Sequence, residues 1–346
     1  MASHGIKDRV AIIGMGCTRF AEHWDKSLDD LIVDAAEETF ASAGLTKDEV
    51  DAYWFGTAQS GMSGITLARP LQLEGKPVTR VENYCTTGSE ALRAAAYAVA
   101  SGAYDVAMAV GAEKVKDSGY QGLNAFPIPN DGTARTLTAA AMFSMVAPAY
   151  GKKFGVGEDE LTEVLARISW KNHQNGARNP RAQFRKEVST ETICASPRVA
   201  GRLGVFDCAG VADGAAEDAY LQAGITDPRH QLAMAEVHDC FTPTELVLME
   251  DLGFAPRGTA WKEVLAGTFD RDGALPVNPD GGLKSFGHPV GASGLRMFFE
   301  AWLQLRGEAT PERQITTDRK LALTHNLGGY PGEMVSFVSV VGTELG

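Results

Sequence analysis

One cysteine, Cys85, stands in the stretch NYCTTGSEAL (residues 83–92), between a short apolar segment and a helical pattern rich in alanine. If the helix begins there, its unpaired N–H groups and the positive end of its dipole favour a thiolate, the nucleophilic form of cysteine. The alternative is an inert buried thiol, because free cysteine is among the residue types most often found in protein interiors. Composition alone favours the second interpretation, so the rest of the sequence must decide between the two.

An internal repeat supplies a partner for this cysteine. CTTGSEALR at 85–93 aligns with HPVGASGLR at 288–296, which sets Cys85 opposite His288. If the two copies pack about an approximate twofold axis, the starts of the equivalent helices meet near that axis. A thiol from one copy and an imidazole from the other would then lie together, as a nucleophile and its base require. The glycines around His288 allow close backbone approach, which a purely structural histidine rarely needs.

Two further stretches carry groups that such chemistry uses. In VHDCFTPTEL, His238 and Cys240 are two residues apart at the end of a predicted strand, so both side chains can face one pocket. In HNLGGYPGE (325–333), glycines after a strand can present backbone N–H groups to an oxyanion. Taken singly, a polar strand end and an ordinary glycine turn are the simpler explanations of these two stretches.

The elements that must position these residues alternate between strands and helices, which indicates the α/β class. SLDDLIVDAAEETFASAG has helical spacing, with Ser27 as its N-cap and Gly44 as its stop. Continuous apolar runs fit strands that are covered on both faces of a sheet. The predicted strands are RVAIIG (9–14), VDAYWFGTA (50–58), YDVAMAVGAE (104–113), LAMAEV (232–237), LALTHNLGG (321–329) and EMVSFVSVV (333–341), and the helix that follows Cys85 ends at Gly102.

A second pair of similar segments, AAEETFASAGLT (35–46) and AAEDAYLQAGIT (215–226), extends the repeat. Its period is far longer than a solenoid unit, so the sequence indicates two copies of one α/β half. The second copy has no room for the strand and loop that precede the helix of the first. Either the protein has lost a segment near 214–217, or residues that belong there are missing from this sequence and the numbering continues without a gap. We favour the second explanation. We interpret the more polar residues 115–200, between the halves, as an insertion whose surface faces the substrate.

Composition limits the classes of function. The 346 residues, of which 44% are hydrophobic, can bury a large core. The formal net charge of −12 and the absence of a basic run in the sequence argue against binding to nucleic acid or to a membrane surface. No apolar run is long enough to span a membrane and the start lacks a signal-peptide pattern, which predicts a cytoplasmic protein. Five cysteines, at positions 17, 85, 194, 208 and 240, form neither a disulfide framework nor a zinc-binding pattern.

The order of four motifs resembles the thiolase superfamily, in particular its sterol-carrier-protein type and bacterial and archaeal relatives. These motifs are CTTG (85–88), HDCF (238–241), GHPVGASG (287–294) and HNLGG (325–329). The resemblance covers essentially the whole chain and implies two βαβαβαββ halves stacked in five layers (αβαβα) with an inserted loop domain. The implied boundaries are 1–114 with 201–216 for the N-terminal half, 115–200 for the insertion and 217–346 for the C-terminal half.

The resemblance also implies roles for individual residues. Cys85 would attack a thioester or a 3-ketone after activation by His288. The usual second cysteine of a CxG motif is absent here, where the chain has Asn326, Leu327 and Gly328, so Cys240 becomes the acid/base candidate. His238, with His288, would stabilise an enolate oxygen. A second oxyanion site would use the backbone N–H groups of Cys85 and Gly328. Coenzyme A is then a substrate, and no metal or bound cofactor is expected.

Several alternatives remain. Some members of the superfamily are retro-aldolases for β-hydroxyacyl-CoA of the steroid side-chain type, with tyrosines at the positions of His238 and His288; Tyr330 keeps that possibility open. A non-catalytic lipid or acyl carrier, or a scaffold subunit, would have lost part of the catalytic set. A dinucleotide site at IIGMGCTR lacks the third glycine of its fingerprint. We interpret His173 as a surface residue, and Cys17, Cys194 and Cys208 as structural.

The expected partners also follow from the resemblance. Besides acyl-CoA substrates, it implies a homodimer that pairs through a central strand and the cysteine-bearing loop. Many relatives with these motifs bind a small subunit with an OB fold and a zinc ribbon, and we expect such a subunit here. Nucleic acid and membranes are not expected partners.

Overall fold

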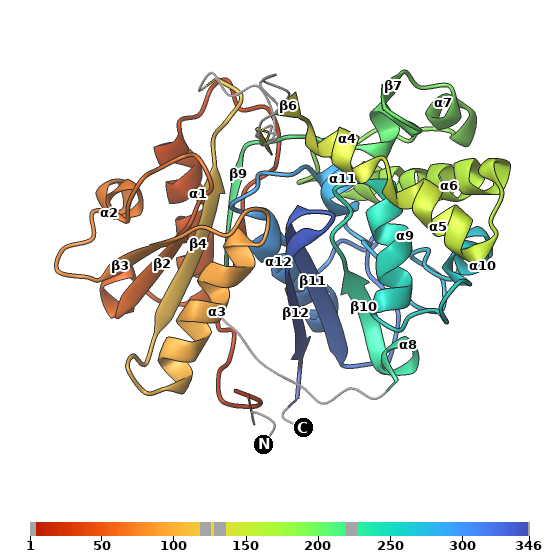
Figure 1. Cartoon of the computed structure of the whole chain (residues 1–346). Coiled ribbons are helices and arrows are strands. Elements are labelled where there is room, and N and C mark those ends of the chain that lie inside the picture. The colour runs from red at the N-terminus through yellow and green to blue at the C-terminus, as the bar shows by residue number, and fades with distance from the viewer. Residues whose placement is uncertain (1–4, 118–125, 128–135, 219–226, 345–346) are drawn as a thin grey trace.

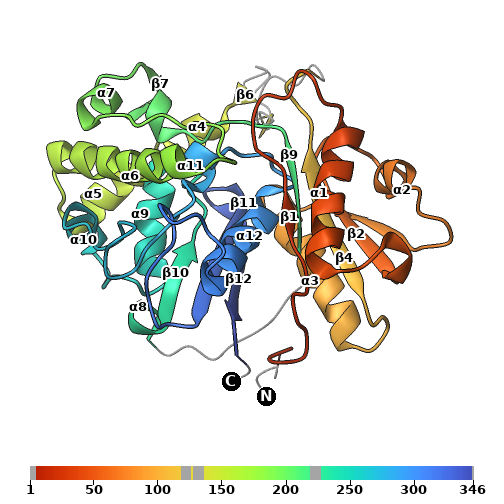
Figure 2. The same cartoon turned by 180° about the vertical axis from the view of Figure 1, so that it is seen from behind.

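The structure is a computed structural model that describes residues 5–117, 126–127, 136–218 and 227–344. Two sheets face each other across a central layer formed by two helices, α3 and α12 (Figures 1 and 2). Helices cover the outer sides, so the order of layers is αβαβα. The first half reads βαβαβαββ: β1 (Gly16–Cys17), α1 (Leu28–Ala43), β2 (Ala52–Gly56), α2 (Ile65–Leu71), β3 (Val78–Val81), α3 (Thr87–Ala100), β4 (Ala107–Glu113) and β9 (Gly214–Asp218).

The sheet of the first half has the order β1-β9-β4-β2-β3. Strands β2, β3 and β4 are parallel, and β9 runs antiparallel to both of its neighbours. A parallel pair needs a crossover connection, and the helices between these strands provide it. Helix α3 packs on the inner face, while α1 lies over the outer face and contributes Leu31 and Ile32 to a core with Val110 of β4.

The predicted helix at 27–44 is confirmed, but the predicted strand at 9–14 is wrong. Ser27 and Asp30 form a capping box, and Gly44 closes helix α1 in the left-handed conformation at φ 67°. β1 comprises only Gly16 and Cys17, and backbone N–H groups in and just before this strand bond to side chains of α1. Met15 donates to Ser42 Oγ at 3.3 Å and Cys17 donates to the Glu38 carboxylate at 3.2 Å.

The insertion between β4 and β9 is mainly helical and lies over the second half (Figure 1). Its longest helix, α6, packs against α9 and α10 of that half, where Leu161 and Leu165 share a core with Leu246. The described elements are β5 (Phe126–Pro127), β6 (Thr136–Leu137), α4 (Ala139–Phe143), α5 (Val146–Phe154), α6 (Glu158–Arg178), α7 (Thr190–Cys194), β7 (Arg198–Ala200), β8 (Leu203–Gly204) and a 3₁₀ turn at Val205–Asp207. A second 3₁₀ turn, Lys47–Glu49, follows α1 in the first half.

The second half has a smaller sheet with the order β10-β11-β12. β10 is parallel to β11, and β12 is antiparallel to β11, the same orientations as in β2-β4-β9 of the first half. A single bridge between Ala235 and Val277 stands where β3 lies in the first sheet. The elements are α8 (Pro228–Gln231), β10 (Leu232–Glu236), α9 (Thr242–Asp251), α10 (Ala260–Leu265), α11 (Gly282–Phe286), α12 (Ser293–Arg306), β11 (Leu321–Tyr330) and β12 (Glu333–Gly342).

The second half thus lacks a counterpart of β1 and α1 among the described residues. β1 borders β9 in the first sheet, but no described strand borders the outer edge of β12. Met334 and Val338 of β12 are 49% and 48% exposed. The letters that resemble helix α1 begin inside strand β9, and their remainder, 219–226, lies outside the described residues.

One further property concerns membranes. Within the described ranges, no helix combines the length and the apolar composition that a membrane span requires.

Candidate active site

The two central helices begin against each other. A Cβ atom on Gly88 of α3 would lie 2.8 Å from the Gly291 carbonyl oxygen, and one on Gly294 of α12 would lie 2.6 Å from the Ser89 nitrogen. Real Cβ atoms do not approach so closely, so glycine is required for this backbone contact. The repeat predicts such a meeting of equivalent helix starts, and the structure confirms it.

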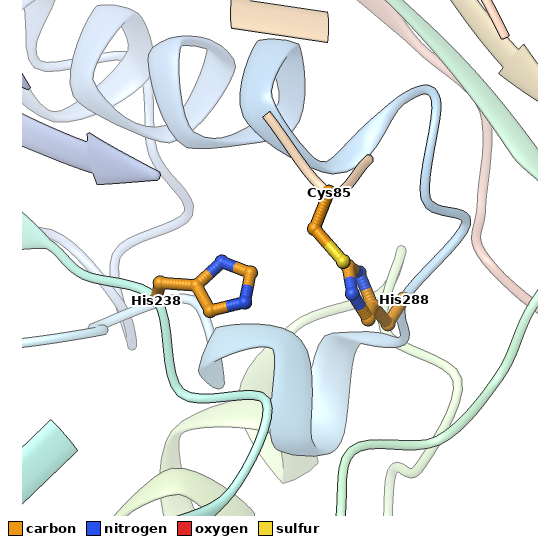
Figure 3. A group of neighbouring side chains, drawn as sticks. All are labelled: Cys85, His238 and His288. Atoms are coloured by element: carbon orange, nitrogen blue, oxygen red, sulfur yellow. The ribbon is translucent and has the colours of Figure 1, made fainter. Parts of the chain in front are cut away.

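Three reactive side chains gather at this meeting point. The sulfur of Cys85 and one ring nitrogen each of His238 and His288 all lie within 4.8 Å of one another. Figure 3 shows the two imidazoles approaching from different elements, with the cysteine sulfur beside the ring of His288. The imidazole ring centroids are 5.6 Å apart and nearly perpendicular, at 81°. The predicted convergence of a thiol from one half and an imidazole from the other is therefore confirmed.

The loop before α3 holds Cys85 in place. Tyr84 adopts φ 49°, an uncommon left-handed conformation for a residue other than glycine. The hydroxyl of Thr87 donates to the Tyr84 carbonyl at 2.6 Å and accepts from the Asn83 N–H at 2.8 Å. These two bonds tie the loop to the first residue of the helix, so Cys85 is fixed at a sharp turn, two residues before α3 begins.

Hydrogen bonds determine which nitrogen of His288 faces the thiol. The Ser293 hydroxyl donates to the Pro289 carbonyl at 2.9 Å, so at 2.7 Å from His288 Nδ1 it acts as the acceptor. His288 therefore carries its proton on Nδ1. Its other nitrogen, Nε2, is buried and has no hydrogen-bond partner among the described residues, which leaves a lone pair for the site.

Asn326 does the same for His238. Its side-chain oxygen accepts from the Leu327 N–H at 3.0 Å and lies 2.7 Å from His238 Nδ1, which must then donate. The amide nitrogen of Asn326 donates to Ser89 Oγ at 3.3 Å, across to the first half. His238 thus also presents Nε2 to the shared space. Sequence reasoning missed these positioning roles, although Asn326 and Ser293 lie inside the quoted motifs.

Burial sets the charge of the group. It raises the pKa of the Cys85 thiol to about 12, with the nearby carboxylates of Glu113 and Glu82 acting in the same direction. It lowers the pKa of His288 to about 3, helped by Arg296, and lowers that of His238 well below its usual range. These shifts favour a neutral thiol beside neutral imidazoles. The expectation that the helix start favours a thiolate is not supported, because α3 begins two residues beyond Cys85 and burial acts in the opposite direction.

The other two predicted site residues lie at the border of this group. Cys240 is buried, with its sulfur 3.8 Å from Thr244 Oγ1. Burial raises its pKa well above the usual value, and Cys85 acts in the same direction. Gly328 packs so closely that a Cβ there would lie 2.7 Å from the Asn83 carbonyl oxygen. The NLGG backbone therefore lies against the loop that carries the nucleophile.

Two buried carboxylates that the sequence analysis missed hold the surrounding loops. Glu113 accepts from the N–H of Gly291 at 2.9 Å and from Thr57 Oγ1 at 3.0 Å, which ties the first sheet to the loop after His288. Asp239, inside the HDCF motif, accepts from the Leu283 N–H at 2.6 Å. Its place between two motif residues was the available signal.

His173 is not a surface residue, contrary to the prediction. It is 3% exposed, its ring lies 5.3 Å from that of Phe206, and burial lowers its pKa to about 3. The polar composition of α6 concealed a face that packs against the second half. Of the remaining cysteines, Cys17 is buried and Cys194 is exposed, and neither belongs to the group around Cys85.

Comparison with known families agrees with this geometry. Residues 10–196 match the N-terminal domain of thiolase, and residues 208–341 match a thiolase C-terminal domain-like unit. The chain is 32% identical to the acetyl-CoA acetyltransferase of Methanothermobacter thermautotrophicus, over 93% of this chain and 97% of the relative. It is 30% identical to sterol carrier protein 2 of Bos taurus, over 93% of this chain and 70% of that protein. The chain belongs to the thiolase family.

Solved structures support the same fold. The "Ltp2-ChsH2(DUF35) aldolase" superposes with a TM-score of 0.78 at 23% identity, covering 96% of this chain and 98% of that one. The acetyl-CoA acetyltransferase of Syntrophomonas wolfei gives 0.67 at 17% identity, covering 97% and 99%. The alignment with the Methanothermobacter protein spans 383 positions, more than the 346 residues of this chain, so that relative carries residues without a counterpart here.

Proposed function

We propose that this thiolase-family acyltransferase cleaves or forms 3-oxoacyl-CoA through an acyl group carried on Cys85. The observation that supports it most is the group of Cys85, His238 and His288, built from both halves within 4.8 Å. The neutral Nε2 of His288 is placed to take the thiol proton as the sulfur attacks. Burial favours the neutral form of both groups, so we expect proton transfer to accompany the attack.

In the cleavage direction, the Cys85 sulfur attacks the 3-keto carbon and the bond between the second and third carbons breaks. The acyl group stays on sulfur, and the departing thioester enolate takes a proton from Cys240 and leaves as the second acyl-CoA product. The thiol of coenzyme A then gives its proton to Cys240 and attacks the acyl-enzyme, which releases the shortened acyl-CoA, and His288 returns its proton to the Cys85 sulfur. Condensation is the reverse sequence. This chemistry uses side chains and coenzyme A alone, without a resident metal or cofactor.

Two sites would stabilise the oxygens that become negative. His288, once it has taken the thiol proton on Nε2, would donate to the thioester enolate; His238, whose Nδ1–H is already bonded to Asn326, would join it as a donor only when Nε2 is protonated as well. The backbone N–H groups of Cys85 and Gly328 would serve the tetrahedral intermediate, and the close packing of Gly328 on Asn83 supports that pairing. Removing one positioned donor of this kind typically lowers kcat by about 10²–10³-fold.

The retro-aldolase remains the second candidate because of the aldolase among the structural neighbours, but at 23% identity this likeness concerns the fold. Tyr330, the residue that kept this possibility open, donates its hydroxyl to Glu333 at 2.5 Å. His238 and His288 are both present where retro-aldolase relatives carry tyrosines. The intact reactive group argues equally against a pure carrier or scaffold.

We also propose a homodimer and a small partner subunit. β3 is the edge strand of the first sheet and leads directly into the loop of Cys85, so pairing of two β3 strands would bring two active sites together. An OB-fold and zinc-ribbon subunit that helps hold coenzyme A is our second proposal; the aldolase neighbour carries a DUF35 component in its name. We expect the assembly to work in the cytoplasm.

The test is thiolysis of acetoacetyl-CoA by coenzyme A, followed as loss of the 3-oxo thioester. The wild-type protein should form acetyl-CoA, and mass spectrometry of the quenched reaction should find an acetyl group on the Cys85 peptide. Cys85→Ala should abolish both signals, and Cys194→Ser, at an exposed cysteine away from the site, should change neither. Aldehyde release from a β-hydroxyacyl-CoA by a protein inert in thiolysis would establish the aldolase instead.

A further inference from the structure

The donor atoms of the active-site group have the chemistry of a soft metal site. Cys85 offers a sulfur, and His238 and His288 each offer a ring nitrogen, all within 4.8 Å. Both imidazoles have Nδ1–H engaged by an oxygen, from Asn326 and Ser293 respectively. This is how proteins orient metal-binding histidines, with the second nitrogen held by an oxygen acceptor so that the first presents its lone pair.

We propose that Cys85, His238 and His288 bind a thiophilic divalent cation, with Zn²⁺ as the best fit, and that occupancy by the ion blocks acyl transfer. Metal binding stands on the geometry alone; the inhibitory effect rests on the proposed function. One sulfur and two nitrogens are donors that suit Zn²⁺, whereas Mg²⁺ and Ca²⁺ prefer oxygen ligands, which this donor set lacks.

The distances require a small contraction. In a tetrahedral site with Zn–S near 2.3 Å and Zn–N near 2.0–2.1 Å, neighbouring donors are about 3.5 Å apart. Starting within 4.8 Å of one another, the donors need to move by less than about 1 Å each. Rotation of the Cys85 side chain and tilting of the two rings can supply this. Three protein ligands leave the fourth position of the tetrahedron for water.

Charge and desolvation also favour the ion. The Nε2 atom of His288 is buried without a partner among the described residues, so a metal bond satisfies an otherwise unmet acceptor. Glu113 and Glu82 act electrostatically on the Cys85 sulfur, and their negative charge favours a cation beside it. On binding, the thiol S–H bond breaks, the Zn–S bond forms and the proton leaves to solvent. The bound sulfur is then no longer free to attack a carbonyl.

Co²⁺ binding to the untagged full-length protein, without any acyl-CoA, tests the site. One Co²⁺ per chain should bind, with visible absorption typical of four-coordinate Co²⁺ and near-ultraviolet thiolate-to-cobalt charge transfer. Zn²⁺ should displace it. Cys85→Ser, and wild-type protein alkylated at Cys85, should both lose the charge-transfer band. His238→Ala should weaken binding by roughly tenfold or more, while Cys194→Ser should bind like wild type.

A wild-type protein without the charge-transfer band, or a band that survives Cys85→Ser, would overturn the proposal. Zn²⁺ should also raise the apparent KM for the acyl donor, leave kcat unchanged and be reversed by a chelator. The two proposals fail separately: a chain that binds Co²⁺ through Cys85 but does not catalyse thiolysis contradicts the proposed function alone, and an active enzyme without the band contradicts the metal site alone.

Discussion

The two halves of the molecule share one plan but differ in completeness. In the first, strand β9 is flanked by β1 and covered by α1, and Val110 beneath that helix is fully buried. In the second, no strand of the described ranges borders the outer edge of β12, and Val338 is 48% exposed. Both halves nevertheless deliver a helix start to the same point, and the reactive group forms there. The unit of β1 and α1, which only the first half has among the described residues, therefore serves to cover the sheet. The inner strands and the central helices α3 and α12 position the reactive side chains.

Breaking the contact between the halves should have the largest effect. In Gly294→Val the Cβ atom of the new side chain would lie 2.6 Å from the Ser89 backbone nitrogen, which is a steric clash. We expect a loss of about 3 kcal/mol or more in the free energy of unfolding and at least a 10²-fold loss of kcat/KM for thiolysis. Gly307→Ala, at the other end of α12, meets nothing within 4 Å and has φ 72°, so it should cost about 1 kcal/mol and retain activity. Equal losses in the two variants would contradict the close contact.

The resting charge state of the shared site gives the next prediction. Since burial raises the pKa of Cys85 to about 12 and lowers that of His288 to about 3, little thiolate exists near neutrality. Alkylation of Cys85 by iodoacetamide, followed peptide by peptide, should accelerate about tenfold per pH unit through the alkaline range. Acyl-CoA should protect it. A rate that levels off below about pH 7 would indicate a thiolate–imidazolium pair and contradict the neutral state.

Ser293 and Asn326, which hold the rings of His288 and His238, give a third prediction. Ser293→Ala leaves Nδ1 of His288 without its acceptor, and Asn326→Ala does so for His238. Each should lower kcat by about 10–100-fold with little change in KM, since the rings act on the reacting atoms. Ser293→Thr should restore most of the activity because it keeps the hydroxyl. A Ser293→Ala enzyme with unchanged kcat and pH profile would show that His288 needs no fixed tautomer.

Much of the frame could be predicted from the sequence. The cap at Ser27 and the strand LAMAEV follow from local patterns. The convergence of Cys85 with His288 follows from the repeat, because similar segments form equivalent elements in the two halves. Burial was harder to predict: the aligned arginines Arg93 and Arg296 have opposite fates. Arg93 is a surface residue paired with Glu90, whereas Arg296 is fully buried between Glu236 and Asp280.

The errors have physical reasons. The strand predicted at 9–14 did not form: strand β1 begins only at Gly16, and the backbone N–H of Met15, just before it, bonds to Ser42 of α1. His173 was predicted to be a surface residue because the polar composition of its helix does not indicate which face packs against the rest of the protein. The sequence also does not reveal desolvation, which acts against a thiolate at Cys85. No periodicity could reveal that Ser293 and Asn326 hold the two histidines, since such bonds depend on tertiary distances.

The smallest effect comes from the exposed sheet of the second half. Val338→Ala should change the free energy of unfolding by less than about 0.5 kcal/mol, because the side chain is half exposed. The same change at Val110, fully buried under α1, should cost about 2 kcal/mol. Urea unfolding of both variants measures the difference. A Val338 variant as destabilised as the Val110 variant would mean that another element covers β12.

The most direct test asks whether the halves act as one catalytic unit. We would measure kcat/KM for acetoacetyl-CoA thiolysis in wild type, Cys85→Ala, His288→Ala and the double variant. A nucleophile and its base working together predict that each single change costs roughly 10³-fold or more and that the double variant loses little further. Losses that multiply in the double variant would contradict the account, because Cys85 and His288 would then contribute independently.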